Sequence, residues 1–328
     1  MLHLSFAGFR HSHIFALHEA ASRHEDIRIS GTWENDPPNS LLEGKNIPLT
    51  HASFEELLGD CDAVAIGDCY ARRGALVIQA LKAGRHVISD KPLCTSLAEL
   101  EEIRKLTRAG GPRVGMMLDL RDSGNLIGLR DAVRSGLVGD VQTVSISAQH
   151  PLLLGTRPSW YFEEGMHGGT LNDIAIHATD FLPWMTGLGL KSVTAARSWN
   201  AKAVETPHFH DCAQFMIELS NGGSVIGDVS YLAPGTCGYS IPNYWRIIVH
   251  GTKGFLETSP GAPAITFADD SSKEPAHLDR APGRPNGYLE DFLAEVSGKP
   301  GANGLTTDSC IEASRVALQL EEAAAGKR

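Results

Sequence analysis

Buried strands alternate with helices over roughly the first 120 residues, and this alternation restricts the possible folds more than any other feature. The predicted strands are residues 2–7, 27–33, 63–67, 86–89 and 114–118, and the predicted helices between them are 14–23, 54–58, 74–83 and 97–109. Strands that are apolar along most of their length are typical of a parallel sheet covered on both faces. The pattern therefore predicts a doubly wound parallel sheet, whose ligands bind beyond the carboxyl ends of its strands.

The second half of the chain has a different pattern, in which several strands follow one another. The predicted strands are 141–148, 192–199, 213–219, 224–231, 245–250 and 255–257, the predicted helices are 126–135, 171–186, 288–296 and 307–325, and 259–287 is predicted to be loop. Asn221-Gly222-Gly223 separates two of these strands and is a hairpin signal. The expected fold class is α/β, with a parallel-sheet domain at 1–121 and an α/β domain with an open, mainly antiparallel sheet at 122–328.

Composition excludes several classes of protein. The net charge is −10 and no run of Lys or Arg compensates it, which argues against a nucleic-acid binder. The six cysteines are scattered and form no CxxC pair, as expected in a reducing compartment. The N-terminal residues have no basic region and no stretch of about 18 apolar residues occurs, so neither a signal peptide nor a membrane span is expected. We expect a cytoplasmic protein.

The turn after the first strand stands where a dinucleotide fingerprint, GxGxxG, would lie. Its residues are Gly8, Phe9, Arg10, His11, Ser12 and His13, of which only Gly8 matches the fingerprint. A helix follows, and its N-terminus offers free N–H groups to a pyrophosphate. Arg10 is expected to add a charge-assisted phosphate contact. The alternative is a plain turn in a domain that binds no dinucleotide.

Two charged motifs lie at the ends of later strands. Glu34 ends the second strand, where an acid accepts hydrogen bonds from the ribose of NAD. No Arg or Lys follows before Lys45, which favours NAD over NADP. Asp90-Lys91-Pro92 ends the fourth strand, where a lysine of lowered pKa suits proton transfer. The alternatives are a solvated turn acid and a surface lysine.

Asp173 and His177 lie four residues apart on a predicted helix, so both side chains are expected on one face. A carboxylate beside an imidazole sets its tautomer and raises its basicity. Thr170 is expected to cap this helix, with Asp173 near the cap position. Alternatively, Asp173 serves only the helix dipole and His177 is a core residue.

Two further groups of residues precede or follow this helix. Arg157, Trp160, Tyr161 and His150 lie in or next to a loop where they would line a sugar pocket, or alternatively form a packed loop. His208, His210 and Asp211 are spaced as two possible metal ligands beside a carboxylate, but a catalytic zinc needs three ligands with a supporting shell. We expect no metal.

These motifs together resemble the glucose-fructose oxidoreductase / inositol dehydrogenase / rhizopine catabolism (Gfo/Idh/MocA) family over nearly the whole chain. The matching segments are 62–66, 80–92, 114–116, 136–141, 168–180 and 250–254. Asp90 replaces the usual Glu of the family's Glu-Lys-Pro motif, and residues 68–73 replace its Thr-Pro-x-x-x-His loop. The resemblance implies a Rossmann domain that binds NAD and a second domain that binds the substrate.

The resemblance also implies roles for single residues. Lys91 would bind the reacting hydroxyl and assist its proton transfer, and His177 would be the principal acid/base or its partner. Asp173 would orient the substrate and His177. The remaining expected cofactor contacts are Asp68, Tyr70 and Arg73, with Asp90 and Lys91, and the expected substrate contacts are Lys91, Arg157, Trp160, Asn172, Asp173 and His177.

The implied reaction is hydride transfer between a carbohydrate-like alcohol and NAD, in a homodimer or homotetramer paired through its open sheet. Two alternatives remain: an NAD-retaining glycosidase or lyase on the same fold, and a non-enzymatic dinucleotide sensor.

Overall fold

The computed structural model describes residues 1–36, 41–108, 110–271, 273–299 and 301–326. The chain forms two compact units, each built from separate stretches of sequence. The first unit comprises Met1–Met117, Pro158–Gly168 and Asn286–Ser314. The second comprises Leu118–Arg157, Gly169–Pro285 and Arg315–Arg328. In the part of the chain that is described, no helix is both long and apolar enough to cross a membrane.

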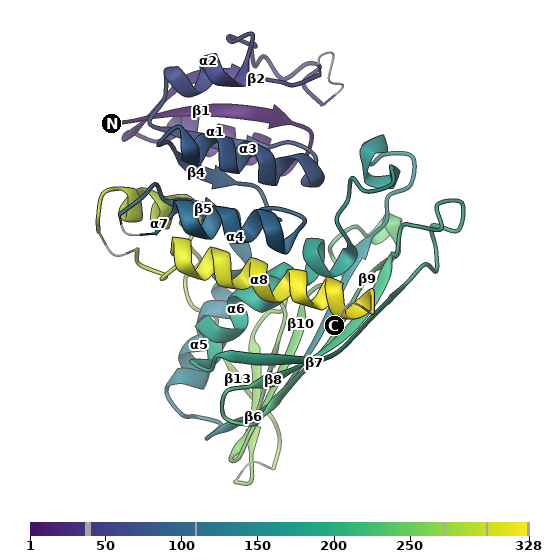
Figure 1. Cartoon of the computed structure of the whole chain (residues 1–328). Coiled ribbons are helices and arrows are strands. Elements are labelled where there is room, and N and C mark those ends of the chain that lie inside the picture. Colours follow the sequence, from purple (N-terminus) through teal and green to yellow (C-terminus); the bar gives the residue numbers. More distant parts are fainter. Residues whose placement is uncertain (37–40, 109, 272, 300, 327–328) are drawn as a thin grey trace. The chain divides into compact units, whose positions relative to one another are not determined.

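The first unit contains a five-stranded parallel sheet with the strand order β2-β1-β3-β4-β5 (Figure 1). Its strands are β1 (Leu2–Phe9), β2 (Ile27–Trp33), β3 (Ala63–Gly67), β4 (His86–Ser89) and β5 (Val114–Met116). Its helices are α1 (His13–Arg23), α2 (Phe54–Gly59), α3 (Tyr70–Lys82), α4 (Leu97–Leu106) and α7 (Gly287–Val296). The predicted doubly wound parallel sheet is confirmed.

Local sequence explains where two of these helices begin. The Ser53 hydroxyl accepts the Glu56 N–H at 3.1 Å, and the Glu56 carboxylate accepts the Ala52 N–H at 3.0 Å. Ser96 and Glu99 repeat the arrangement at α4, where the Ser96 hydroxyl accepts the Glu99 N–H at 3.2 Å. These capping boxes satisfy N–H groups that have no partner within the helix.

The second unit contains an eight-stranded sheet with the order β13-β12-β11-β10-β6-β9-β8-β7. Its strands are β6 (Val141–Pro151), β7 (Leu190–Trp199), β8 (Cys212–Leu219), β9 (Ser224–Ala233), β10 (Arg246–Gly251), β11 (Gly254–Thr258), β12 (Ile265–Asp269) and β13 (Ala276–Leu278). Among the strand pairs of this sheet in the described residues, only β6 and β9 are parallel, so the predicted mainly antiparallel sheet is confirmed.

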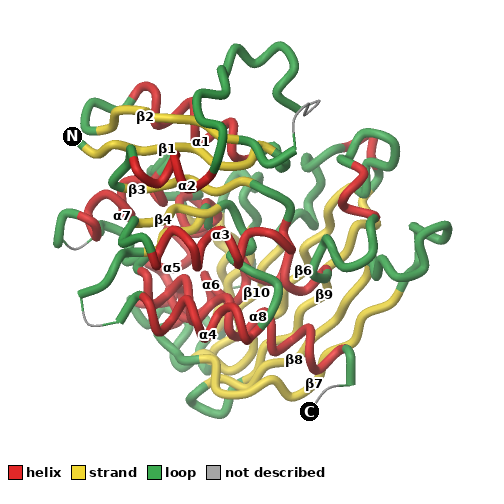
Figure 2. Tube along the Cα trace, turned by 45° about the horizontal axis from the view of Figure 1, so that its top comes forward, coloured by secondary structure: helices red, strands yellow, loops and turns green. Residues whose placement is uncertain are grey.

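Helices α5 (Gly124–Arg134) and α6 (Ile176–Thr186) and the π-helical turn η3 (Leu171–Ala175) pack on one face of this second sheet. The 3-10 turns η1 (Asp119–Asp122) and η4 (Gly235–Cys237) belong to the same unit, and η2 (Ser159–Phe162) belongs to the first. Figure 2 shows strands β9, β8 and β7 side by side in this sheet. The opposite face exposes Met216 and Ile226. Helix α8 (Thr307–Ala324) contributes its first residues to the first unit and the rest to the second.

Two predictions about secondary structure are wrong. The segment 259–287 is not all loop, because β12 and β13 lie within it and extend the sheet beside β11. These strands have five and three residues and lie among Pro and Gly, so their own sequence gives little strand signal. The predicted helix 171–186 is not uniform either, because its first turn is π-helical.

Candidate functional site

The turn between β1 and α1 requires glycine at position 8. Gly8 has a φ of +73°, and a Cβ there would lie 2.7 Å from the Asp68 Cβ and 2.8 Å from its backbone. The carboxyl ends of β1 and β3 therefore approach too closely for any side chain at this position. At the start of α1, the Ser12 and His13 N–H groups donate no backbone hydrogen bond to any described residue. The turn thus keeps the backbone features that suit a pyrophosphate, without the other two glycines.

Glu34 fastens this turn from the end of β2. Its carboxylate accepts the Phe9 N–H at 2.9 Å and the Arg10 Nε–H at 2.9 Å, and its side chain is fully buried. Arg10 also donates to the Asp36 carbonyl, and the Asp36 carboxylate lies 2.6 Å from Arg72. No Arg or Lys follows Glu34 in the sequence before Lys45, but the fold brings Arg10 and Arg72 to these acids from other elements.

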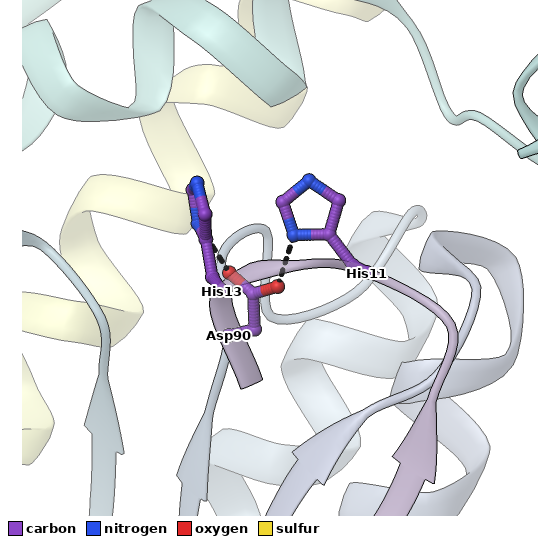
Figure 3. Close-up of side chains that lie close together, drawn as sticks. All are labelled: His11, His13 and Asp90. Carbon is purple, nitrogen blue, oxygen red and sulfur yellow. Dashed lines mark hydrogen bonds and ion pairs between the residues drawn. The ribbon is translucent and has the colours of Figure 1, made fainter. Parts of the chain in front are cut away.

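Asp90 is a buried carboxylate at the centre of a cluster of polar side chains (Figure 3). Its carboxylate lies 2.5 Å from Nδ1 of His11, 3.1 Å from Nδ1 of His13, and accepts the Arg73 NH2 group at 2.9 Å. Burial alone would raise the pKa of Asp90, but His11 and Arg73 outweigh it and hold that pKa well below its usual range. Burial lowers the pKa of His11 to about 4, so this imidazole is neutral near pH 7. His11 then donates Nδ1–H to Asp90 and keeps Nε2 as an acceptor.

Arg73 connects this cluster to the Asp90-Lys91-Pro92 corner. Its guanidinium is fully buried and donates to the Asp68 carbonyl at 2.8 Å, the Lys91 carbonyl at 2.5 Å and the Pro92 carbonyl at 3.2 Å. Lys91 is itself buried. Arg73 therefore fixes the backbone that carries the candidate catalytic lysine.

The ring nitrogens of His11 and His13 and an oxygen of Asp90 lie within 4.8 Å of one another, close enough to consider a metal ion. However, the Arg73 guanidinium binds the same carboxylate, and a divalent ion would lie beside that fixed positive charge. The donor set suits a hydrogen-bonded cluster better than a metal centre.

Trp160 and Tyr161 pack within the first unit. The Trp160 indole N–H donates to the Arg10 carbonyl at 3.0 Å, and the Tyr161 hydroxyl lies 2.6 Å from that of Tyr70. Both residues are buried, and the Tyr161 ring stacks on His11 at 6.1 Å between centroids. Their segment therefore covers the turn that carries Arg10 and His11.

In the second unit, η3 and α6 carry Asn172, Asp173 and His177, all of which are buried. The Asp173 carboxylate accepts a short hydrogen bond from the Tyr231 hydroxyl. The His177 ring meets the buried Trp245 ring edge-to-face at 5.5 Å. Neither Tyr231 nor Trp245 has a sequence signal that connects it to this helix, because both come from strand ends remote in the chain.

Arg157 and Thr170 have other partners than those expected. The Arg157 guanidinium lies 5.0 Å from the Tyr231 ring and donates to the Leu152 and Pro151 carbonyls at 2.8 and 2.9 Å. Arg157 thus supports the tyrosine that contacts Asp173. Thr170 makes no side-chain cap and donates its hydroxyl to the His210 carbonyl, so the predicted cap is wrong.

The His208–Asp211 segment has a structural role for its carboxylate. Asp211 accepts the N–H groups of Ala201, Lys202 and Ala203 at 2.6 to 2.8 Å. His210 Nδ1 lies 2.8 Å from the Ser198 hydroxyl. The carboxylate is occupied in organising a loop.

Two family models match the chain. Residues 6–117 match the oxidoreductase family with an NAD-binding Rossmann fold, and residues 127–257 match the Gfo/Idh/MocA C-terminal domain. Among the relatives, an inositol 2-dehydrogenase from Rhizobium meliloti is 25% identical over 248 residues, which are 74% of this chain and 72% of that enzyme.

Solved structures share the fold. A putative oxidoreductase from Thermotoga maritima has a TM-score of 0.86 at 22% identity, covering 100% of this chain and 99% of that one. An oxidoreductase from Agrobacterium radiobacter in complex with NAD+, L-tartaric acid and magnesium has a TM-score of 0.80 at 17% identity, covering 100% and 97%. With both family models matched in order along the chain, this protein belongs to the Gfo/Idh/MocA family of oxidoreductases and carries its NAD-binding Rossmann domain.

Proposed function

We propose that this enzyme transfers hydride between NAD and a carbinol carbon of a cyclic polyol, sugar or sugar derivative. The observation that supports this most directly is the segment with Asp173 and His177, where Asp173 accepts the Tyr231 hydroxyl. A buried carboxylate held in this way is suited to orient a substrate hydroxyl beside an imidazole. The similarity to an inositol 2-dehydrogenase supports a polyol as the substrate of this enzyme.

In this proposal, His177 accepts the hydroxyl proton when the alcohol is oxidised and returns it in the reverse direction. Asp173 accepts a second substrate hydroxyl and sets its position. The aromatic rings of Tyr231 and Trp245 exclude water and favour the apolar face of a sugar or cyclitol ring. NAD supplies the hydride acceptor when bound, and no metal is required.

Lys91 is proposed to bind the reacting hydroxyl through its ammonium group and to assist proton transfer. Its backbone is held by Arg73, which accounts for the precise placement that such a role needs. The N–H groups of Ser12 and His13 at the start of α1 would hold the pyrophosphate. His11 is neutral and its Nε2 is a hydrogen-bond acceptor. It is therefore better suited to bind an N–H or O–H group of the cofactor than the cofactor's phosphates, which are themselves acceptors.

We further propose that NAD is preferred over NADP. A 2′-phosphate near the end of β2 would approach the buried carboxylate of Glu34 and the nearby Asp36. The two arginines beside them are already paired with these acids, so little positive charge remains for a phosphate.

The test is a panel of inositols, aldoses and sugar acids with NAD and, separately, NADP, with NADH or NADPH absorbance as the readout. Lys91→Ala and His177→Ala are each expected to lower kcat at least about a hundredfold. The double variant should lose less than the product of the two losses if both act in one step. Product release without net NADH would instead indicate the glycosidase or lyase alternative. Binding of NAD with no turnover of any alcohol would indicate a sensor.

We also propose a cytoplasmic homodimer or homotetramer. None of the six cysteines, all of which are described, forms a disulfide, which fits a reducing compartment. Met216 and Ile226 are 41% and 52% exposed on the open sheet face, where a second copy would cover them. Size-exclusion chromatography with light scattering tests this, since a 35.2 kDa species would refute it.

A further inference from the structure

Glu321, near the end of α8, contacts the first turn of the segment that carries Asp173 and His177. One carboxylate oxygen of Glu321, Oε1, accepts the Leu171 N–H at 2.7 Å and the Asn172 N–H at 3.1 Å. Both partners belong to the second unit, although they are separated by about half of the chain's length. The contact therefore joins the last helix to the start of η3.

The π-helical turn η3 has a particular need for such an acceptor. The first N–H groups of a helix have no partner within it, and Thr170 supplies no side-chain cap. Asp173, one residue further on, donates its N–H to the Gly169 carbonyl at 3.0 Å. Glu321 thus takes the place of the missing cap.

Gly169 makes room for this carboxylate. Its φ is +97°, and a Cβ on Gly169 would lie 2.1 to 2.4 Å from the Glu321 carboxyl atoms. The residue as a whole is partly buried, but its carboxyl group lies directly on the Gly169 backbone. The absence of a side chain at Gly169 therefore allows Glu321 to reach the first turn of η3.

The charge of Glu321 also suits its position. A carboxylate at a helix N-terminus interacts favourably with the helix dipole. Burial raises the pKa of Glu321 to about 7, and the Asn172 and Leu171 N–H groups act in the opposite direction. Burying a carboxylate costs free energy, and proteins retain such a cost where the geometry that the group fixes serves a functional site.

We propose that Glu321 is a positioning residue that fixes the π-helical turn and, through it, the orientation of Asp173 and His177. This role rests on the proposed function, in which those two side chains contact the substrate. Glu321 itself touches no reacting atom. Its removal should lower kcat for the alcohol and leave KM for NAD unchanged, because NAD binds to the first unit.

The experiment compares Glu321→Ala, Glu321→Met and Glu321→Gln with Glu322→Ala in the full-length enzyme. Gln keeps an oxygen acceptor without charge, Met fills similar volume without an acceptor, and Glu322 is an exposed neighbour that serves as control. Amide hydrogen exchange at Leu171 and Asn172 is measured together with kcat and KM.

Loss of the acceptor in the Ala and Met variants should speed exchange at both amides and lower kcat, each by roughly tenfold. The Gln variant should restore both to within about threefold, and the Glu322 control should match the wild type. If Ala fails to fold, the Met and Gln variants provide the comparison. Unchanged kcat in a folded Met variant, or equal losses in Met and Gln, would overturn the proposal.

The two hypotheses can fail separately. If the wild type forms no NADH from any alcohol, the proposed function fails. Amide exchange at Leu171 and Asn172 then still decides whether Glu321 holds the π-helical turn. Unaltered exchange in the Met variant would show that Glu321 does not hold this turn.

Discussion

Nδ1 of His11 lies 2.5 Å from the Asp90 carboxylate, inside a cluster from which water is largely excluded. Two of the three fingerprint glycines are replaced in this turn by Arg10 and His13, and His11 lies between them. The acid that corresponds to the family's Glu-Lys-Pro motif is thus committed to holding the turn in shape.

This pairing predicts an acid-sensitive fold. The pKa of His11 is lowered from 6.5 to about 4, so the unfolded chain binds a proton that the folded chain does not. Stability should therefore fall as the pH drops from 6.5 to 4, by up to about 3 kcal/mol from this residue. His11→Gln should flatten the decline in urea unfolding, whereas the exposed His277→Gln should not. An equally steep decline in both variants would contradict the prediction.

Arg121 and Asp180 form a second buried pair, which holds α6 to η1. The Arg121 Nε–H and NH2 groups donate to the two Asp180 oxygens at 2.7 and 2.5 Å. Arg121→Met would leave a buried carboxylate without its partner and should cost about 3–5 kcal/mol at neutral pH. The double variant Arg121→Met/Asp180→Leu should recover much of this loss in urea unfolding. If the double variant is less stable than Arg121→Met alone, this expectation is wrong, and the charged pair itself stabilises the fold.

Cofactor choice should depend on Glu34. Glu34→Gln removes the negative charge and weakens the hold on Arg10, which then becomes available to a 2′-phosphate. The ratio of kcat/KM for NAD to that for NADP should fall by about tenfold or more, equivalent to about 1.4 kcal/mol. The exposed Glu25→Gln is the matched control. A ratio that stays constant would place the selectivity elsewhere.

The pH dependence expected from Glu321 has the opposite sign to that of His11. Burial raises its pKa from 4.5 to about 7, so the folded chain keeps a proton that the unfolded chain releases. Its contribution to stability should decline as the pH rises from 4.5 to 7, by about 1–3 kcal/mol. Glu321→Gln should therefore gain stability relative to wild type on going from pH 5 to pH 8. Glu322→Gln should show no such trend.

The sequence predicts regular elements better than the partners of buried polar groups. Apolar strands such as Ala63–Gly67 have strong local signals, and the parallel sheet follows from them. Strands β12 and β13 lack such signals because their pairing with β11 determines them. A π-helical turn has no reliable periodicity over five residues, so no sequence pattern distinguishes η3 from the first turn of an α-helix.

In the candidate site, too, the sequence indicates residues that lie in motifs but not the partners that the fold brings to them. Asp173, His177 and Lys91 stand out because each lies in a recognisable sequence motif, Lys91 in Asp90-Lys91-Pro92 and the other two in the 168–180 segment. Tyr231, Trp245 and Glu321 contact this segment from distant strands and helices, and no local pattern connects them with it. Similarly, Arg72 pairs with Asp36 only because the fold brings α3 next to the end of β2.

The first unit is assembled from three stretches, the last of which ends at Ser314. Tyr161 of the second stretch bonds to Tyr70, and Phe292 of the third packs 2.8 Å from the position a Cβ would take on Gly115. During synthesis on the ribosome, strands β1 to β5 emerge long before the second and third stretches that pack on them. The nascent parallel sheet must remain partly uncovered until these later stretches have been synthesised, which exposes its apolar surface to chaperones and to aggregation in the meantime.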